Sequence, residues 1–274
     1  MLSTAVRHPA VAGKFYPGSC DDLRAEVSTY LTSSKSTNEP RLRAIGCIAP
    51  HAGYMYSGQV AGAVFGSIEI PRRCIVMCPN HTGQGRALAI MSQGSWETPL
   101  GEVPIDSKLA ESLKEEFPAL EEDSAAHRAE HAVEVELPFL QVRQPELAFV
   151  PIALGTGRFE ILEKLGRAVA RVITRQSDPV LIVASSDMNH YEADAVTRAK
   201  DHRAIERILT LDARGLFDVV TQQNVSMCGF GPAVAMITAA RELGATSAEL
   251  VKYATSGDIS GNRDMVVGYA GVVV

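Results

Sequence analysis

Short apolar runs that alternate with longer amphipathic segments constrain the fold of this chain most strongly. Four runs are rich in β-branched residues and end at turn or polar residues: 44–49, 74–78, 147–152 and 180–184. A fifth run, 265–274, ends the chain. Continuous apolar runs of this length suit strands that are buried on both faces of a sheet. We therefore expect a sheet that is covered on both sides.

Segments with helical spacing lie between these runs. They cover residues 21–31, 106–117, 129–141, 159–175, 194–210, 213–222 and 232–243. The last has Pro232 at its first position and Gly244 just beyond its end, an asymmetry that helices favour. Strands that alternate with helices predict a single layered α/β domain over residues 1–274, with a mostly parallel or mixed central sheet flanked by helices. The polar stretch 33–40 predicts a mobile loop that is too short to divide domains.

Charge and composition limit the classes of partner. The formal net charge is −6, which argues against nucleic acid, because a nucleic-acid binder needs a basic face to neutralise phosphates. Apolar stretches stay shorter than the roughly 18 residues that indicate a membrane-spanning helix, and residues 1–9 lack the apolar core of a signal peptide. We expect a cytoplasmic protein whose five cysteines remain thiols. Cys74 and Cys78 share a strand face and are interpreted as core, with a metal pair as the alternative.

Three histidines follow strand-like runs and define the candidate site. His51 comes after the first run, His81 after the second and His190 after the fourth. Ligands of α/β sheets bind at the carboxyl ends of strands, and imidazole suits Fe, Zn, Cu and Ni. We expect the three side chains to converge on one transition-metal site. For each histidine alone, a loop residue that caps a turn is the alternative.

Cys228 is a fourth candidate ligand. It precedes the helix that is expected to begin at Pro232. The positive end of that helix is expected to lower the thiol pKa and favour the thiolate, the form that binds metal. A buried, inert cysteine is the alternative.

The polar segment around His127 and His131 offers further candidates. Four residues separate the two histidines, so they are expected to share a helix face, as are Glu130 and Glu134. The spacing lacks the HExxH pattern of zinc peptidases. We interpret His131 and Glu134 as residues that orient the metal ligands, with a solvated helix face as the alternative.

Motifs of other enzyme classes are missing. The sequence has no GxxxxGK[ST] phosphate loop, no GxGxxG after a strand and no GxSxG elbow. Ser185 and Ser186 lie near a histidine, as in a hydrolase, but nothing marks either serine as a nucleophile.

Ordered motifs along nearly the whole chain resemble the Memo family, also called AmmeMemoRadiSam system protein B. They are RHPAVAGKFYP from Arg7, PHAGYMYSG from Pro50, PNHTG from Pro79, EHAVEVELPFL from Glu130, SSDMNHY from Ser185, MCGFGP from Met227 and YATSGDISG from Tyr253. This family is similar in fold to class III extradiol dioxygenases, which use non-heme Fe(II) to cleave catechol rings. The resemblance implies a related α/β fold with a metal pocket.

The resemblance also implies the metal ligands. His51 and His81 match the two histidine ligands, and Cys228 stands where the dioxygenases supply a carboxylate. Family members are linked to iron or copper, so Fe(II) is the expected cofactor and copper the alternative. Two histidines and a cysteine form a softer donor set than two histidines and a carboxylate. Ring cleavage therefore does not follow from the fold.

Proton transfer and ligand binding are implied for four further residues. His190 matches the acid/base histidine of the dioxygenases, and Asp187 is expected in the same pocket. A histidine with a pKa near 6.5 suits proton transfer at neutral pH. Tyr16 and Tyr54 are expected to line the mouth of the pocket.

These observations support three hypotheses of function. The first is a metal-dependent oxidoreductase, dioxygenase-like, that acts on O2 or an unidentified small substrate. The second is a non-catalytic binding or adaptor protein for a peptide or small ligand, because animal members are linked to the docking of receptor-derived phosphopeptides. The third, suggested by the family's composite name, is a partner of a radical-SAM protein. Titration of a ligand before and after chelation separates the first two.

Overall fold

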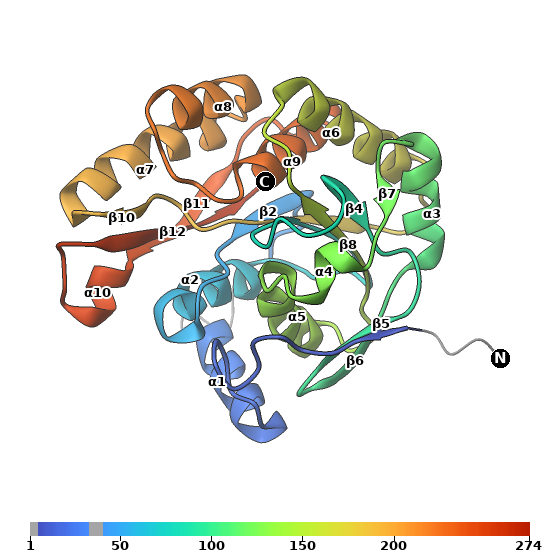
Figure 1. The fold of residues 1–274 in the computed structure, drawn as a ribbon, viewed down its shortest axis with the longest axis horizontal. Coiled ribbons are helices and arrows are strands. Elements are labelled where there is room, and N and C mark those ends of the chain that lie inside the picture. Colours follow the sequence, from blue (N-terminus) through green and yellow to red (C-terminus); the bar gives the residue numbers. More distant parts are fainter. Residues whose placement is uncertain (1–4, 33–40) are drawn as a thin grey trace.

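The four predicted apolar runs form the parallel centre of the main sheet. The computed structural model describes residues 5–32 and 41–274, and the predicted loop 33–40 lies outside them. The central strands, in spatial order, are β2 (Gly46–Ala49), β9 (Val180–Ser185), β3 (Arg73–Pro79) and β8 (Ala148–Leu154). Each pair of neighbours is parallel. Their carboxyl ends therefore meet at one edge of the sheet (Figure 1).

Antiparallel strands extend this centre on both sides. The run at the end of the chain forms β12 (Val266–Val273), which pairs with β2, and β4 (Leu88–Ile90) pairs with β8. The outer strands are β10 (His190–Glu192) and β11 (Glu249–Thr255), which both pair with β12, and β7 (Glu121–Glu122), which pairs with β4. The prediction of an α/β fold with a mixed central sheet is confirmed.

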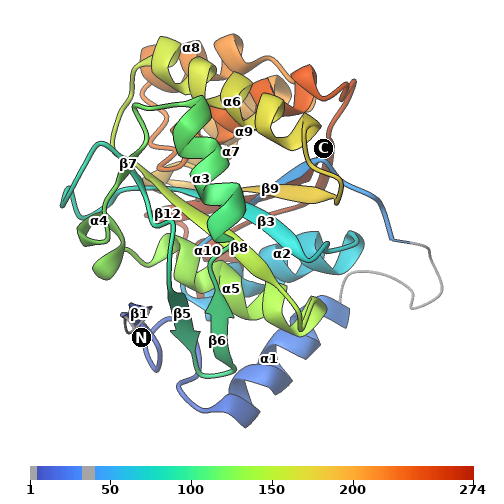
Figure 2. The same ribbon diagram turned by 90° about the vertical axis from the view of Figure 1, so that its right-hand side faces the viewer.

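Helices cover both faces of the sheet (Figure 2). One face carries α3 (Ser107–Glu116), α6 (Phe159–Thr174), α7 (Asp194–Leu209), α8 (Ala213–Gln222) and α9 (Phe230–Glu242). The other carries α1 (Cys20–Thr32), α2 (Tyr54–Ser67), α5 (Ala132–Arg143) and a small sheet of β1 (Val6–Arg7), β5 (Ser95–Thr98) and β6 (Gly101–Pro104).

Strand periodicity separates two hydrophobic cores. Along β3, Ile75 and Met77 belong to the core under α6 and α9, whereas Cys74 and Cys78 point to the opposite face and pack in the core under α2 and α5. This is the alternation that a pleated strand imposes. The interpretation of Cys74 and Cys78 as core residues on one face is confirmed.

Two predicted helices begin differently in the structure. The helix expected over 129–141 begins only at Ala132, as α5. Residues 129–131 connect it to a separate short helix, α4 (Ala125–Arg128). The last long helix begins at Phe230, with Gly229 as its N-cap, rather than at Pro232. Proline is tolerated throughout the first turn of a helix. The backbone N–H groups of that turn have no intrahelical acceptor, so the N–H that proline lacks costs no hydrogen bond.

Helix α2 was not expected from the sequence. Ten of its fourteen residues are buried, so it lacks the polar stripe that reveals a surface helix. Gly58 and Gly62, four residues apart, allow Tyr30 of α1 to pack against it. A Cβ at either glycine would lie 2.5 Å from an atom of Tyr30. Other elements that were not expected include the β5–β6 hairpin, β11, the short helix α10 (Ser256–Ser260) and the short strands β1, β4, β7 and β10.

Within the described residues, every helix is too short or too polar to cross a membrane.

Candidate metal centre

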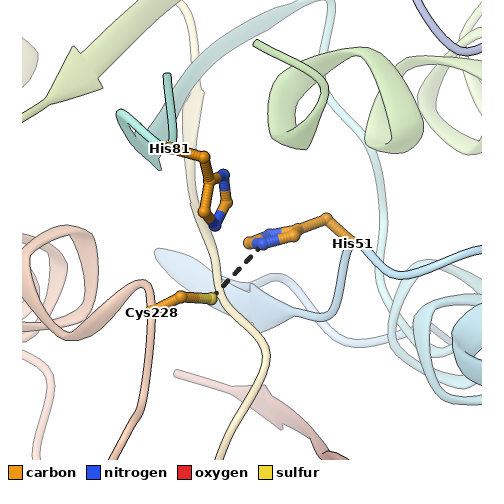
Figure 3. Close-up of side chains that lie close together, drawn as sticks. All are labelled: His51, His81 and Cys228. Carbon is orange, nitrogen blue, oxygen red and sulfur yellow. Dashed lines mark hydrogen bonds between the residues drawn. The ribbon is translucent and has the colours of Figure 1, made fainter. Parts of the chain in front are cut away.

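Three side chains from distant parts of the chain meet at the carboxyl edge of the sheet. His51 follows β2 and His81 follows β3, while Cys228 lies between α8 and α9. Their ligand atoms all lie within 4.8 Å of one another, and His51 Nε2 is 3.3 Å from Cys228 Sγ. In Figure 3 both imidazole rings point toward the sulfur atom.

His51 is held from two sides in an orientation that leaves Nε2 free. Its backbone N–H donates to Asp187 Oδ1 (2.8 Å), and its Nδ1 lies 2.8 Å from Ser185 Oγ. The Ser185 hydroxyl has acceptors in Glu136 Oε1 (2.8 Å) and Ala132 O (3.2 Å), so it can accept the Nδ1 proton of His51. Burial lowers the pKa of His51 well below its usual value. The imidazole is therefore neutral at pH 7, as a metal ligand must be.

His81 is oriented by a buried carboxylate, Glu130. Oε1 of Glu130 lies 2.9 Å from His81 Nδ1, and Oε2 accepts the His81 backbone N–H at 2.6 Å. The backbone N–H of Ala132 also donates to Glu130. Burial alone would raise the pKa of Glu130, but the hydrogen bond and charge of His81 lower it. A carboxylate behind the ring fixes Nδ1 as the donor and directs Nε2 to the centre.

Of the two residues predicted to orient the ligands, the structure brings His131 to the centre but not Glu134. The His131 ring stacks on that of His81, with centroids 4.8 Å apart and planes inclined by 20°. Glu134 instead binds the N-terminal segment, where it forms an ion pair with Arg7 and accepts a 2.6 Å hydrogen bond from Tyr16. The carboxylate that orients a ligand in this segment is Glu130, behind His81, and not Glu134.

The break between α4 and α5 also separates His127 from His131, so they do not share a helix face. His127 is fully buried with its ring 5.7 Å from that of Trp96, and burial lowers its pKa to about 4. It belongs to the core, whereas His131 lies at the N-cap of α5. The prediction that His127 and His131 share a helix face is wrong.

The thiol of Cys228 has a different character from the one predicted. Burial raises its pKa, and the nearby charge of Asp187 adds to this effect. The backbone N–H groups of Asp187 and Gly229 act in the opposite direction but do not compensate. The expected lowering by α9 is therefore wrong, because desolvation of the thiolate exceeds the stabilisation from the helix end. A metal that binds Sγ has to displace the thiol proton.

His190 and Asp187 line the same cavity as the cluster. The backbone N–H of His190 donates to Ser226 Oγ (2.7 Å), and its Nδ1 lies 2.9 Å from the carbonyl oxygen of Ser226. Nδ1 therefore carries the proton, and Nε2 is free to exchange protons with a ligand. Burial raises the pKa of Asp187 to about 6. A carboxyl group with this pKa can change protonation state near neutral pH.

The cavity measures about 510 Å³ and is open to solvent on one side. Its lining residues come from the strand ends, the N-terminal segment and β12: Phe15, His51, Ala52, Gly53, His81, His131, Asp187, His190, Tyr191, Ser226, Cys228, Val267 and Tyr269. The expected tyrosines are absent from this set. Tyr16 and Tyr54 are 3% and 1% exposed. Their hydroxyls donate to Glu134 and to the carbonyl oxygen of Val135, so the structure does not bring them to the mouth.

The donor atoms fit a transition metal. Two imidazole nitrogens and one sulfur face one another, and the second nitrogen of each ring is occupied by Ser185 or Glu130. Nitrogen and sulfur donors of this kind suit Fe, Cu or Zn rather than Mg or Ca. His81, Glu130 and His131 also lie close enough to hold a cation, but three N–H groups already engage the Glu130 carboxylate.

Fold and site together define a mixed α/β protein with two histidines and a cysteine clustered at the carboxyl edge of its sheet. Residues 7–273 match the sequence profile described as Memo-like protein. A MEMO1 family protein of Methanothermobacter thermautotrophicus is 41% identical over 273 residues, which cover 97% of this chain and 99% of the relative. One of Pyrobaculum aerophilum is 41% identical over 276 residues and covers 98% of each chain. The chain belongs to the Memo family.

A solved structure shares the fold. The crystal structure of the uncharacterized protein JW3007 from Escherichia coli K12 matches with a TM-score of 0.55 and 12% sequence identity, over 83% of this chain and 99% of that one. At this identity the likeness concerns the fold alone.

Several residues of the site were missed by the sequence analysis. Ser226 fixes His190, and Tyr191 and Tyr269 line the cavity. Tyr191 is adjacent to His190 in SSDMNHY, so its position could have been inferred from the strand end. Nothing in the sequence around Ser226 or Tyr269 signals a role, because both reach the site through tertiary contacts.

Proposed function

We propose that this protein is a non-heme metal-dependent oxidoreductase of the Memo family, with Fe(II), or alternatively copper, held by His51, His81 and Cys228. The observation that carries the proposal is the convergence of three free donor atoms within 4.8 Å from three separate chain segments. Two independent supports, Ser185 and Glu130, keep the remaining ring nitrogens away from the centre. Preorganisation of this kind is typical of a functional site, since a chain of 274 residues needs no metal to hold its core.

The bound metal would supply electron transfer to O2 or to a small ligand in the cavity, and the chain would supply the proton chemistry. Ser226 holds His190 Nδ1 as a donor, so Nε2 can accept a proton from a ligand and return it. Asp187, whose pKa is raised to about 6, can share that proton.

Oxygen uptake tests the proposal. Metal-free protein is reconstituted with one equivalent of Fe(II) or Cu(I) under argon, and oxygen consumption is followed with a panel of small oxygen-bearing organic compounds. Wild type should consume oxygen only when loaded. The His190→Gln variant should keep its metal but turn over roughly 10²- to 10⁴-fold more slowly, the usual contribution of a general acid or base.

The control separates catalysis from simple binding. His202→Gln removes an imidazole from the exposed surface of α7 and should leave uptake unchanged. Loaded protein that binds a ligand yet never consumes oxygen, with the same ligand affinity after chelation, would contradict the proposal. That result would instead identify a non-catalytic binding protein.

A further inference from the structure

Tyr269 of β12 is a buried residue whose hydroxyl has no hydrogen-bond partner among the described residues. The side chain is 2% exposed and lines the cavity over the metal cluster. Throughout residues 5–32 and 41–274, no hydrogen bond to its hydroxyl is formed. The equally buried Tyr16 and Tyr54, by contrast, each donate to an acceptor of the protein. The hydroxyl of a buried tyrosine usually has a partner, so the Tyr269 hydroxyl is available to water or to a ligand that enters the cavity.

The hydroxyl of Tyr269 is a donor at neutral pH. Burial and the nearby charge of Asp187 raise its pKa, so the group keeps its proton. It lines the same cavity as His51 and Cys228. A ligand oxygen that accepts this hydrogen bond therefore lies in the same space as the metal cluster.

Tyr191 lines the solvent-exposed side of the same cavity. It is 69% exposed, and its backbone has φ 60°, which non-glycine residues seldom adopt. Strain of this kind is retained where the side chain has a use. Tyr191 and Tyr269 line the same cavity, so both rings are available to the same ligand.

The charges of the cavity limit what that ligand can be. Among the described lining residues there is no Lys or Arg, while Asp187 and Cys228 are both groups that become negative. Phe15 and Val267 make part of the wall apolar. In the metal-free cavity, a phosphate dianion would lose its hydration without gaining a Lys or Arg partner. A ligand that carries a neutral or singly charged oxygen on an apolar group would lose much less hydration.

We propose that Tyr269 binds the ligand of this protein through a hydrogen bond to an oxygen atom, and that the ligand is a small organic molecule without a phosphate group. This proposal rests on the proposed function in that the ligand occupies the same cavity. It does not require a bound metal. Tyr269 and Tyr191 replace Tyr16 and Tyr54 as the ligand-binding tyrosines.

Two chromophoric probes of matched shape test it: 4-nitrophenol and 4-nitrophenyl phosphate. The full chain is titrated at pH 7 by difference absorbance, once metal-free and once loaded. Wild type should bind 4-nitrophenol in both forms. In the metal-free form it should bind the phosphate roughly tenfold or more weakly, because the phosphate charge is unpaired there. Tyr269→Phe should bind 4-nitrophenol about fivefold to tenfold more weakly, the loss of one hydrogen bond.

Stability distinguishes a ligand contact from a structural one. Because the hydroxyl has no partner in the protein, Tyr269→Phe should leave the Tm unchanged or higher, whereas loss of a structural hydrogen bond lowers it. Tyr30→Phe, which removes a hydroxyl bonded to Glu26 on α1, is the control and should bind the probes like wild type.

Unchanged 4-nitrophenol affinity in Tyr269→Phe, a lowered Tm in that variant, absence of 4-nitrophenol binding by wild type, or equal affinity for the phosphate would each overturn the proposal. Its failure is separable from that of the proposed function. If Tyr269→Phe binds 4-nitrophenol like wild type while the protein still retains its metal, this inference alone is refuted. If Tyr269→Phe binds 4-nitrophenol more weakly but the purified protein retains no metal, the metal-dependent function alone is refuted.

Discussion

Replacement of Glu130 by glutamine should weaken metal binding without any change to a ligand. Glu130 is fully buried, and its two oxygens accept three N–H groups: the backbone and Nδ1 of His81, and the backbone of Ala132. Glutamine keeps the shape but replaces one oxygen with an NH2 group. At least one of the donors on His81 or Ala132 then faces another donor.

The magnitude follows from these contacts. An unsatisfied buried donor costs about 1–3 kcal/mol of stability. Loss of the acceptor behind a ligating histidine typically costs 10- to 100-fold in metal affinity. Glu130→Gln should therefore bind metal one to two orders of magnitude more weakly, with His81, the supported ligand, less firmly oriented.

The assay is competition with a chromophoric chelator, combined with urea denaturation of the metal-free proteins. Glu134→Gln is the matched control, because Glu134 is equally buried in the same segment but binds Arg7 rather than a ligand. It leaves a buried cation unpaired, which costs about 3–5 kcal/mol, yet it should change metal affinity little. Metal affinity of Glu130→Gln equal to wild type, or equally weakened in Glu134→Gln, would refute the reasoning.

Two further predictions concern stability. Burial raises the pKa of Asp201 to about 6, against about 3.9 in an unfolded chain, so the folded state favours the protonated acid and loses roughly 2 kcal/mol as pH rises from 4 to 7. In Asp201→Asn this loss should vanish in urea titrations at the two pH values; an unchanged pH slope would contradict it. Tyr191→Gly should be about 1 kcal/mol more stable than Tyr191→Ala, because only glycine adopts φ 60° without strain. Equal midpoints in thermal denaturation would show that no strain is present.

The strand ends of the candidate site could be predicted from the sequence, because local pattern controls them. Apolar runs fix β2 and β3, and a parallel sheet brings their carboxyl ends to one edge. His51 and His81 were therefore expected to meet, and the structure brings their rings together with centroids 5.1 Å apart. Cys228 was a candidate ligand from its place before a helix, but only the family resemblance placed it beside the two histidines, since its own segment carries no strand pattern.

The residues that orient the ligands could not be predicted, because their roles depend on which buried side chains come into contact in the folded chain. Glu130 and Glu134 lie in the same run, and only the break before α5 decides that Glu130 faces His81. The pKa of Cys228 was mispredicted for a similar reason. Proximity to a helix end is visible in the sequence, whereas the degree of desolvation is not.

Metal content of the purified protein tests the central claim most directly. The chain is expressed without added chelator, and iron and copper are measured by mass spectrometry in wild type, His51→Ala and Cys228→Ser, with Cys20→Ser as an exposed-cysteine control. Wild type and Cys20→Ser should retain close to one equivalent, and the two ligand variants should retain almost none. Wild type without iron or copper, or ligand variants with as much metal as wild type, would contradict the assignment of the cluster as a metal centre.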